Sequence, residues 1–226
     1  MNTTTTILSI DKTFESFLTA VYTGFHEELD IIEIRLSEEK NALLFNQPRH
    51  IAADREKARW VWDWLYNKGT ADLRLVYFAF LSEKEEVLLP LLEFTRLLFL
   101  GKGPEFSNRL SVLRRKLVPW AERVDSEKQK LETHLKIKSR QGEFNGCSFR
   151  PVYDILPLLT RYCREHFGPD PWVLVDAKRN YGLRKNGEGV ECFRLPVGSS
   201  GLSGTTMQPH SPGVSTHTLE PLQEAV

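Results

Sequence analysis

Three charged residues follow an apolar run in the C-terminal half of the chain, and they are the first candidates for chemistry. Trp172 to Val175 is apolar and rich in β-branched residues, which predicts a strand covered on both faces, and Asp176, Lys178 and Arg179 come at its end. A carboxylate can serve as an acid or a base, and the two cations can bind phosphate. The sequence therefore predicts a functional site at the open end of a buried strand.

Two further residues could complete an active site with Asp176. His166 lies at the end of an expected helix, and Asp11 follows an expected strand near the N-terminus. In an enzyme, Asp176 would act as acid or base with His166 or Asp11 beside it, which requires the side chains to converge in one pocket. The alternative is that Asp176 and Arg179 form a structural ion pair that holds the sheet to the first helix.

A set of cations suggests a different function, the binding of nucleic acid. Residues 134–140 alternate with a period of two, which predicts a strand with Leu135 and Ile137 on one face and a basic row on the other. The residues expected to contact phosphates are Lys136, Lys138, Arg140, Lys178, Arg179 and Arg184. Lysines on an exposed strand also prevent edge-to-edge aggregation, so this second explanation stays open.

The elements expected around these residues are strands toward the two ends of the chain and helices in the middle. Hydrophobic periodicity predicts helices over residues 14–26, 54–68, 71–81, 83–100, 108–132 and 151–167. Strands are expected over residues 7–10, 134–140, 144–150 and 172–175, followed by two short returning strands that end near residue 195. The predicted fold class is α+β, a helical middle packed with an antiparallel sheet formed mainly by the C-terminal strands, which the N-terminal strand joins.

Local signals indicate where several helices begin and what they bury. Thr13 is a possible N-cap for the first helix, and Ser82 with Glu85 forms a capping box for the helix that ends near residue 100. Aromatic residues of the helix over 14–26 recur at steps of three and four. We interpret that stripe as core packing in preference to a platform for stacking a ligand.

Composition bounds the class of protein. The formal net charge is zero, so binding of nucleic acid or membrane would need a local patch. Residues 134–196 hold 11 basic and 7 acidic residues, an excess of four positive charges, whereas the N-terminal half is acidic. The three cysteines are widely spaced and predict free thiols, no metal site and no cofactor.

The expected organisation is one domain over residues 1–196 and a disordered tail over residues 197–226, where glycine, serine, threonine and proline dominate. No run of about 18 apolar residues is present and no secretory leader is recognisable. We therefore expect a cytoplasmic protein without membrane contact.

Three stretches, spread in order over residues 7 to 195, resemble a bacterial family described as probable DNA metabolism proteins. The first is residues 11–21, Asp-Lys-Thr-Phe-Glu-Ser-Phe-Leu-Thr-Ala-Val; the second is residues 154–159 with His166 and Phe167; the third runs from Pro171 and Trp172 to Asp176 and Arg179. The resemblance implies an accessory protein of DNA repair or modification. It also implies a partner, either a radical SAM protein or a uracil-DNA glycosylase-like domain.

The chain departs from the family pattern at several positions. Lys12 and Ser16 stand where the family has glycine. The family's Glu-x-His-Arg…Gly-Phe-x-Arg-Phe segment falls on residues 127–137, with Glu127 kept. There the family's histidine, arginine, phenylalanine and second arginine are replaced by Gln129, Lys130, His134 and Lys136. Lysine keeps the charge of arginine but loses its two-pronged phosphate geometry.

The favoured hypothesis is a DNA-binding accessory protein that works with such a partner. The enzyme with Asp176, His166 and Asp11 is the second hypothesis. A protein-interaction module, whose acidic segment over residues 27–39 docks a basic partner without DNA contact, is the third.

Overall fold

The computed structural model describes residues 5–37, 48–101, 103–140, 146–167, 171–187 and 189–195. The chain falls into two compact units, Met1–Arg123 and Val124–Val226, and each is described by itself. The boundary lies inside the stretch 1–196 for which the sequence predicts one domain, and that organisation stays a prediction. The predicted tail over 197–226 lies outside the described residues.

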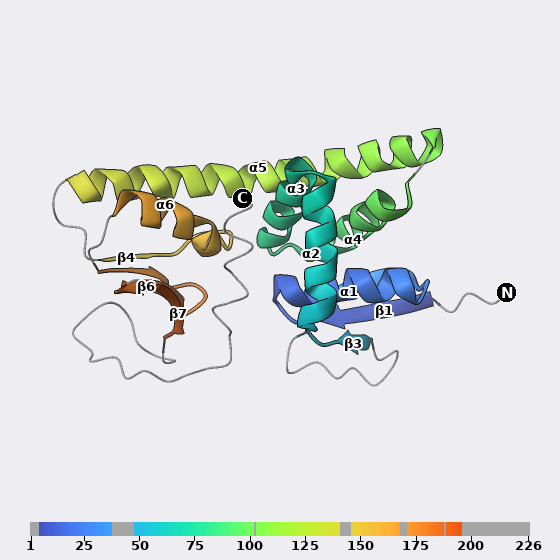
Figure 1. Cartoon of the computed structure of the whole chain (residues 1–226), viewed down its shortest axis with the longest axis horizontal. Helices are drawn as coiled ribbons and strands as arrows, with labels where there is room; N and C mark the ends of the chain where they lie inside the picture. Colours follow the sequence, from blue (N-terminus) through green and yellow to red (C-terminus); the bar gives the residue numbers. More distant parts are fainter. Residues whose placement is uncertain are drawn as a thin grey trace. The chain divides into compact units, whose positions relative to one another are not determined.

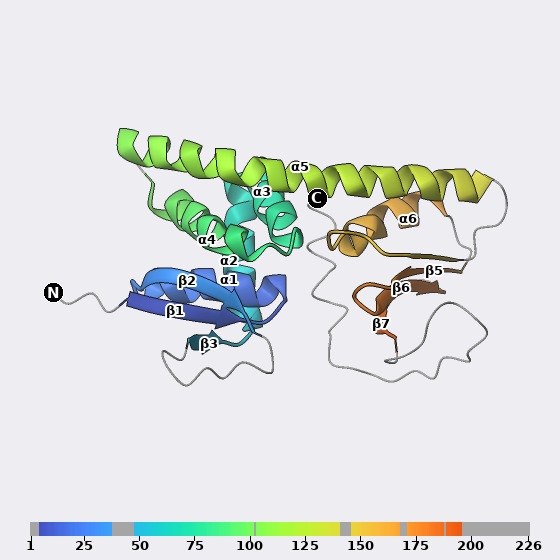
Figure 2. The ribbon, with the colours of Figure 1, turned by 180° about the vertical axis from the view of Figure 1, so that it is seen from behind.

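The first unit contains a parallel sheet of three strands in the order β2-β1-β3. The strands are β1 (Thr5–Ile10), β2 (Asp30–Leu36) and β3 (Arg49–Ile51), and β1 pairs in parallel with both neighbours. Helix α1 (Phe14–His26) connects β1 to β2, as parallel pairing requires a crossover. It lies along one face of the sheet (Figures 1 and 2).

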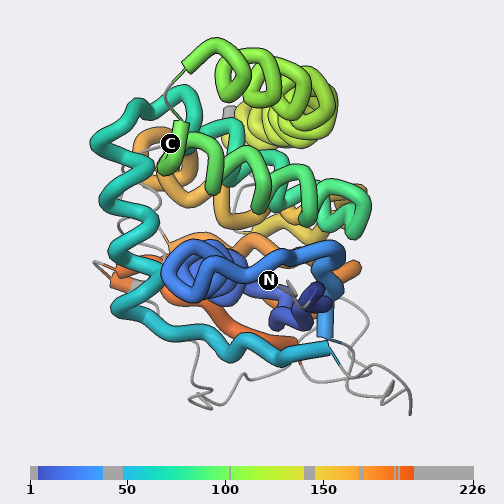
Figure 3. Tube along the Cα trace, turned by 90° about the vertical axis from the view of Figure 1, so that its right-hand side faces the viewer, coloured from blue at the N-terminus to red at the C-terminus, as the bar shows by residue number. Residues whose placement is uncertain are grey.

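Helices complete the first unit. They are α2 (Arg55–Lys68), α3 (Thr70–Leu81), α4 (Glu85–Leu100) and the first part of α5 (Pro104–Arg140). Figure 3 shows α1 nearly end-on in blue, with α2 in cyan beside it. The predicted start of α1 is confirmed, because the Thr13 side chain accepts from the amide of Ser16. The helix expected from residue 54 begins at Arg55, and the Asp54 side chain caps it.

Two buried hydroxyls fix the strand ends to the helices. The Ser16 hydroxyl donates to the Ile51 carbonyl at 2.9 Å and accepts from the Asp11 amide at 3.1 Å. The Thr19 hydroxyl lies 3.0 Å from the Asp54 amide, whose hydrogen bond it accepts. These bonds satisfy backbone groups that would otherwise be buried without partners.

The second unit contains a mixed sheet of four strands in the order β4-β5-β6-β7. The strands are β4 (Gly146–Phe149), β5 (Trp172–Asp176), β6 (Tyr181–Asn186) and β7 (Gly189–Arg194). The 3₁₀ helix η1 (Leu156–Leu159), the helix α6 (Thr160–His166) and the end of α5 cover it (Figure 1). The buried cluster between them is Leu135, Cys147, Leu156, Leu159, Cys163, Phe167, Trp172, Leu174 and Leu183.

The predicted class of helix and strand together is confirmed, but the predicted sheet is wrong in two respects. The N-terminal strand does not join the C-terminal strands; β1 belongs to its own parallel sheet because α1 returns the chain to β2. The C-terminal sheet is mixed, since β4 pairs with β5 in parallel, while β5, β6 and β7 are antiparallel as expected.

The predicted basic strand over residues 134–140 is also wrong, because α5 continues to Arg140. Leu131 and Leu135 are one helical turn apart and both pack against the core of the second unit, with Leu135 fully buried. Ile137, expected on the same face as Leu135, is 53% exposed. The basic row on one face of a strand therefore does not exist.

Two helix boundaries differ from expectation for local reasons. Ser82 does not begin α4; its hydroxyl donates to the Ala79 carbonyl at 2.6 Å, at the end of α3, and Lys84 precedes α4 without a side-chain cap. The helix expected over residues 151–167 starts only at Leu156. Side chains hold the backbone of residues 151–153 in another conformation, as described below.

Gly182 provides a test of the sheet in the second unit. A Cβ at this position would lie 2.6 Å from the Leu174 carbonyl oxygen and closer still to the Phe193 ring, so one contact involves backbone that cannot swing away. We expect Gly182→Ala to destabilise the second unit by about 1–3 kcal/mol through overpacking. A Cβ at Gly189 meets nothing within 4 Å, so Gly189→Ala should stay within about 0.5 kcal/mol of the parent. Urea denaturation of both variants measures the difference, and equal midpoints would contradict this packing.

Candidate functional site

The end of β5 is built around a buried carboxylate. The Asp176 side chain is 0% exposed. Its Oδ1 accepts hydrogen bonds from the backbone amides of Lys178 at 2.9 Å and Arg179 at 3.1 Å, and its Oδ2 accepts from Arg179 Nη1 at 2.7 Å. A buried charge needs such a partner, since a lone carboxylate would pay the full desolvation cost.

The two cations next to this carboxylate also bind the backbone of another segment. The Lys178 ammonium donates to the carbonyl of Val152. Arg179 Nη2 donates to the same carbonyl at 3.1 Å, and its Nη1 lies 3.5 Å from the carbonyl of Pro151. Both cations therefore donate hydrogen bonds to the start of the segment 151–154.

The same segment is held from other elements as well. The Glu127 carboxylate, on α5, accepts from the amides of Val152 at 2.8 Å and Tyr153 at 2.9 Å. The Tyr181 hydroxyl, on β6, bonds the Asp154 carboxylate. We define the 151–154 clamp as Glu127, Lys178, Arg179 and Tyr181, which contact this segment, together with Asp176, which positions Arg179.

The clamp brings together three of the residues singled out from sequence, Asp176, Lys178 and Arg179. They contact one another and the backbone of the segment 151–154. This geometry favours the structural ion pair that the sequence also allowed. The pair was expected to hold the first helix, but Arg179 instead binds the segment 151–154. Sequence patterns pointed neither to Tyr181 nor to Glu127 as part of the arrangement, apart from the resemblance in which Glu127 is kept.

The other two predicted catalytic residues are not part of the clamp. His166 ends α6, where its exposed ring stacks on Tyr162 with centroids 4.2 Å apart and its Nδ1 lies 2.9 Å from the Tyr162 carbonyl. Asp11 belongs to the first unit. Among the described residues, no hydrogen bond or ion pair joins His166 to Asp176. The catalytic roles of the three residues stay predictions.

Asp11 has a partner that the sequence did not reveal. His50 Nε2 lies 3.8 Å from Asp11 Oδ1, and both side chains are about half exposed. They come from the carboxyl ends of β1 and β3, where the strand order changes direction, and open α/β sheets place ligands at this position. His50 was missed because β3 has only three residues and gives no periodic signal.

The predicted phosphate-binding residues divide into two groups. Lys136 is exposed and Lys138 half-buried near the end of α5, and no described carboxylate forms an ion pair with either. Arg140 is the last residue of α5, and its side chain lies outside the described part of the structure. Arg184 pairs with Glu191 at 2.9 Å, and Lys178 and Arg179 belong to the clamp.

Two carboxylates of the predicted acidic segment are also neutralised. Glu27 accepts from Arg49 at 2.8 Å, and Glu33 accepts from Arg35 at 2.9 Å. The hydrogen bond from each arginine lowers the pKa of its carboxyl partner. The segment is therefore less negative toward a basic partner than its composition suggests. Its residues from 38 onward are outside the described ranges.

A search of the described residues finds no group of three or more histidine, cysteine, aspartate or glutamate side chains that could hold a metal ion. Within the same residues, every helix is too short or too polar to span a bilayer. Neither finding adds a candidate site.

Comparison with known proteins does not extend this description. No protein family, no curated protein and no solved structure matches the chain. The fold and the site define an α+β protein, and the 151–154 clamp organises its second unit.

Removal of the buried charge should be far more costly than removal of a surface charge in the same sheet. Asp176→Asn leaves Arg179 without its carboxylate, and we expect a loss of about 3–5 kcal/mol in the unfolding free energy of the second unit. Glu191→Gln breaks the exposed pair with Arg184 and should cost less than about 1 kcal/mol. Urea denaturation compares the two variants, and similar losses would show that the clamp does not depend on this pair.

The buried thiols predict a loss of stability at alkaline pH. Burial raises the pKa of the free thiols of Cys147, Cys163 and Cys192, most strongly at Cys163. The folded state keeps these protons while the unfolded thiols ionise above about pH 8.5, so stability is present below that pH and falls as the pH rises. The slope for Cys163 approaches about 1.4 kcal/mol per pH unit. Denaturation between about pH 8 and pH 10 should show a shallower loss for Cys163→Ala than for the parent, whereas parallel curves would contradict the assignment.

Proposed function

We propose that the protein is an accessory protein of DNA repair or modification that binds nucleic acid through the end of α5. The proposal is carried by one observation. Residues 133–140 of α5 contain Lys136, Lys138, Arg140 and His134 but no acidic residue, and no described carboxylate forms an ion pair with either lysine. Phosphate contacts need cations of this kind, which are not already neutralised.

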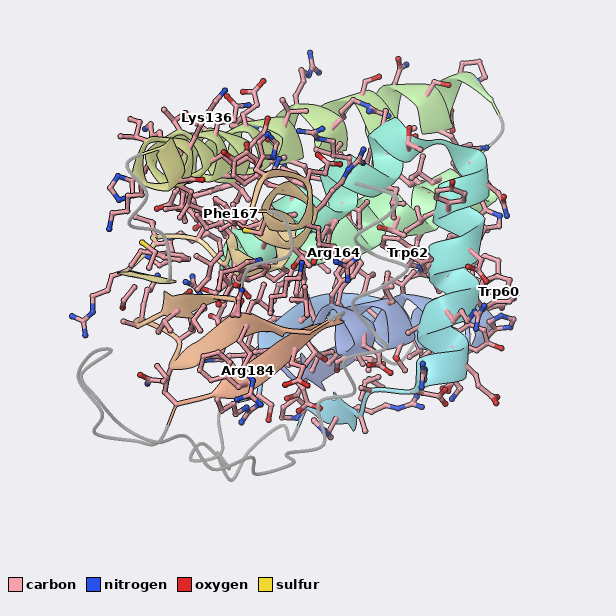
Figure 4. The ribbon with its side chains drawn as sticks, turned by 60° about the vertical axis from the view of Figure 1, so that its left-hand side comes forward. Trp60, Trp62, Lys136, Arg164, Phe167 and Arg184 are labelled. Carbon is pink, nitrogen blue, oxygen red and sulfur yellow. The ribbon has the colours of Figure 1, made fainter. Side chains whose placement is uncertain are left out.

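Helical periodicity distributes these cations over two stripes. Lys136 and Arg140 are one turn apart, and Lys130, His134 and Lys138 follow one another at steps of four. Lys130, His134 and Lys136 are exposed, and Figure 4 shows Lys136 on the outer side of α5. Cations on two flanks of one helix can reach phosphates on both sides of it.

The resemblance to probable DNA metabolism proteins supports the same surface. Lys130 and Lys136 stand where that family has arginine, and both are exposed on α5. A lysine keeps the attraction to phosphate as a point charge. By the same resemblance, the partner is a radical SAM protein or a uracil-DNA glycosylase-like protein.

The clamp narrows the set of residues that we assign to DNA. Lys178 and Arg179 hold the segment 151–154, and Arg184 pairs with Glu191, so each of them already donates to an acceptor of the protein. The proposal therefore assigns the phosphate contacts to α5 and leaves a structural role to the cations of the sheet. Cations at a helix C-terminus also stabilise the helix through its dipole, which is the alternative that an experiment must separate.

Fluorescence anisotropy with a labelled DNA duplex, titrated at several salt concentrations, tests the proposal. We expect the affinity to fall steeply with salt, with a slope of about 0.9 per phosphate contact. The double variant Lys136→Gln, Lys138→Gln should reduce the slope by up to about 2.

The control removes two cations that are already paired. Lys128 pairs with Glu132 and Arg161 pairs with Glu165, so Lys128→Gln, Arg161→Gln changes the net charge equally. The control should keep the parent slope. Absence of duplex binding, or an equal loss in both double variants, would count against the proposal, and a loss of thermal stability alone would indicate the dipole role.

A further inference from the structure

Six aromatic rings gather at the surface of the first unit, away from its core. They come from α1 (Tyr22, Phe25 and His26), α2 (Trp60 and Trp64) and α4 (Phe99), and we call them the ring surface. Phe99 stacks with two indoles: its centroid is 3.7 Å from that of Trp64 and 5.5 Å from that of Trp60, and the planes of Trp60 and Phe99 differ by 6°. Trp60, Phe99 and Trp64 therefore form a stack, and the rings of α1 pack beside it.

This stack is separate from the aromatic core of the same unit. Phe14, Phe17 and Trp62 are buried, whereas Trp60 is 43% exposed. Figure 4 shows Trp60 and Trp62 on opposite sides of α2, with Trp62 toward the other helices. The aromatic stripe of α1 was expected to be core packing throughout. Only the rings in the N-terminal part of α1 are buried in the core, and those in its C-terminal part belong to the ring surface.

Lysines lie at both ends of the exposed stripe on α2. Lys57, Trp60, Trp64 and Lys68 follow one another at steps of three and four, so they share one face of the helix. Lys57 Nζ lies 5.9 Å from the Tyr22 ring and Lys68 Nζ lies 5.7 Å from the Trp64 ring. Asp54 pairs with Lys57 at 3.4 Å, and no described carboxylate forms an ion pair with Lys68.

We propose that the ring surface binds single-stranded nucleic acid, with unpaired bases stacking against Trp60 and the lysines attracting the backbone. Rings with cations at their flanks match a polymer whose units carry a flat π-face and a negative charge. Paired bases in a duplex do not present their faces, so the ligand is a single strand. The stack is already held by contacts among its own rings, which lowers the cost of ordering side chains on binding.

This inference rests on the proposed function and deepens it, because it adds a strand type and a second contact surface. The two surfaces are tested with different ligands and different variants. Duplex binding reports on the end of α5, and oligothymidine binding reports on the ring surface.

The experiment measures anisotropy of a labelled oligothymidine with the full chain at low salt. Trp60→Ala should weaken binding about 5- to 150-fold, the range for losing one stacked base. Trp60→Phe keeps a ring and should restore most of the affinity, while it removes the quenching of tryptophan emission that stacking on Trp60 causes. Circular dichroism of each variant checks that it folds as the parent does.

Tyr66→Ala is the matched control. Tyr66 lies on α2 and is 50% exposed, as accessible as Trp60, but it is not among the six rings of the ring surface. Its removal should leave oligothymidine binding unchanged. Equal losses for Trp60→Ala and Tyr66→Ala, unchanged binding by Trp60→Ala, or equal competition by duplex would each overturn the inference.

The remaining outcomes separate this inference from the proposed function. If only the lysine variants of α5 weaken DNA binding, the ring surface has no such role and the proposed function stands. If Trp60→Ala alone weakens oligothymidine binding and the lysine variants bind duplex as the parent does, the ring surface stands and the proposed function falls. If Trp60→Ala leaves DNA binding intact but abolishes self-association in sedimentation, the surface is a protein interface and the inference is overturned.

Discussion

The second unit depends on the need to compensate one buried negative charge. Asp176 ends the most buried strand of the sheet with no exposed surface, so its carboxylate must find donors within the protein. Arg179 and two backbone amides supply them. The guanidinium then reaches the carbonyls of the segment 151–154, whose amides are held in turn by Glu127. One electrostatic requirement thus connects β5, α5 and the connection between β4 and η1.

This requirement also changes which cations can serve a ligand. Lys178 and Arg179, which look like a phosphate site in the sequence, are used as donors to backbone carbonyls. The lysines near the end of α5 form no ion pair with a described carboxylate. A positive side chain indicates a binding surface only when no acceptor of the protein already binds it. Whether such an acceptor is near depends on contacts between residues far apart in the chain.

The positions of the resemblance to probable DNA metabolism proteins also fall into a buried group and an exposed group. The positions that agree with that pattern include Glu127, Trp172, Asp176 and Arg179, which build the clamp or the core beneath it. Four departures, Gln129, Lys130, His134 and Lys136, all lie on the exposed side of α5. At another departure, Ser16, the hydroxyl is used to tie Asp11 to Ile51. Substitutions on an exposed helix face alter a surface without disturbing the packing beneath it.

The sequence by itself determined the local elements whose signals are contained within a few residues. The periodicity and the cap at Thr13 predicted α1 with its observed bounds, and the run Trp172–Val175 with the turn after it predicted the antiparallel strands β5 to β7. Only the tertiary structure decided the rest. Residues 134–140 alternate in a way that suits a strand, yet Leu135 is buried one turn after Leu131, and packing against the sheet selects the helix. Three features depend on residues that are far apart in the chain: the strand partners, the late start of η1 and the pairing of Asp11 with His50. A local sequence pattern does not indicate such partners.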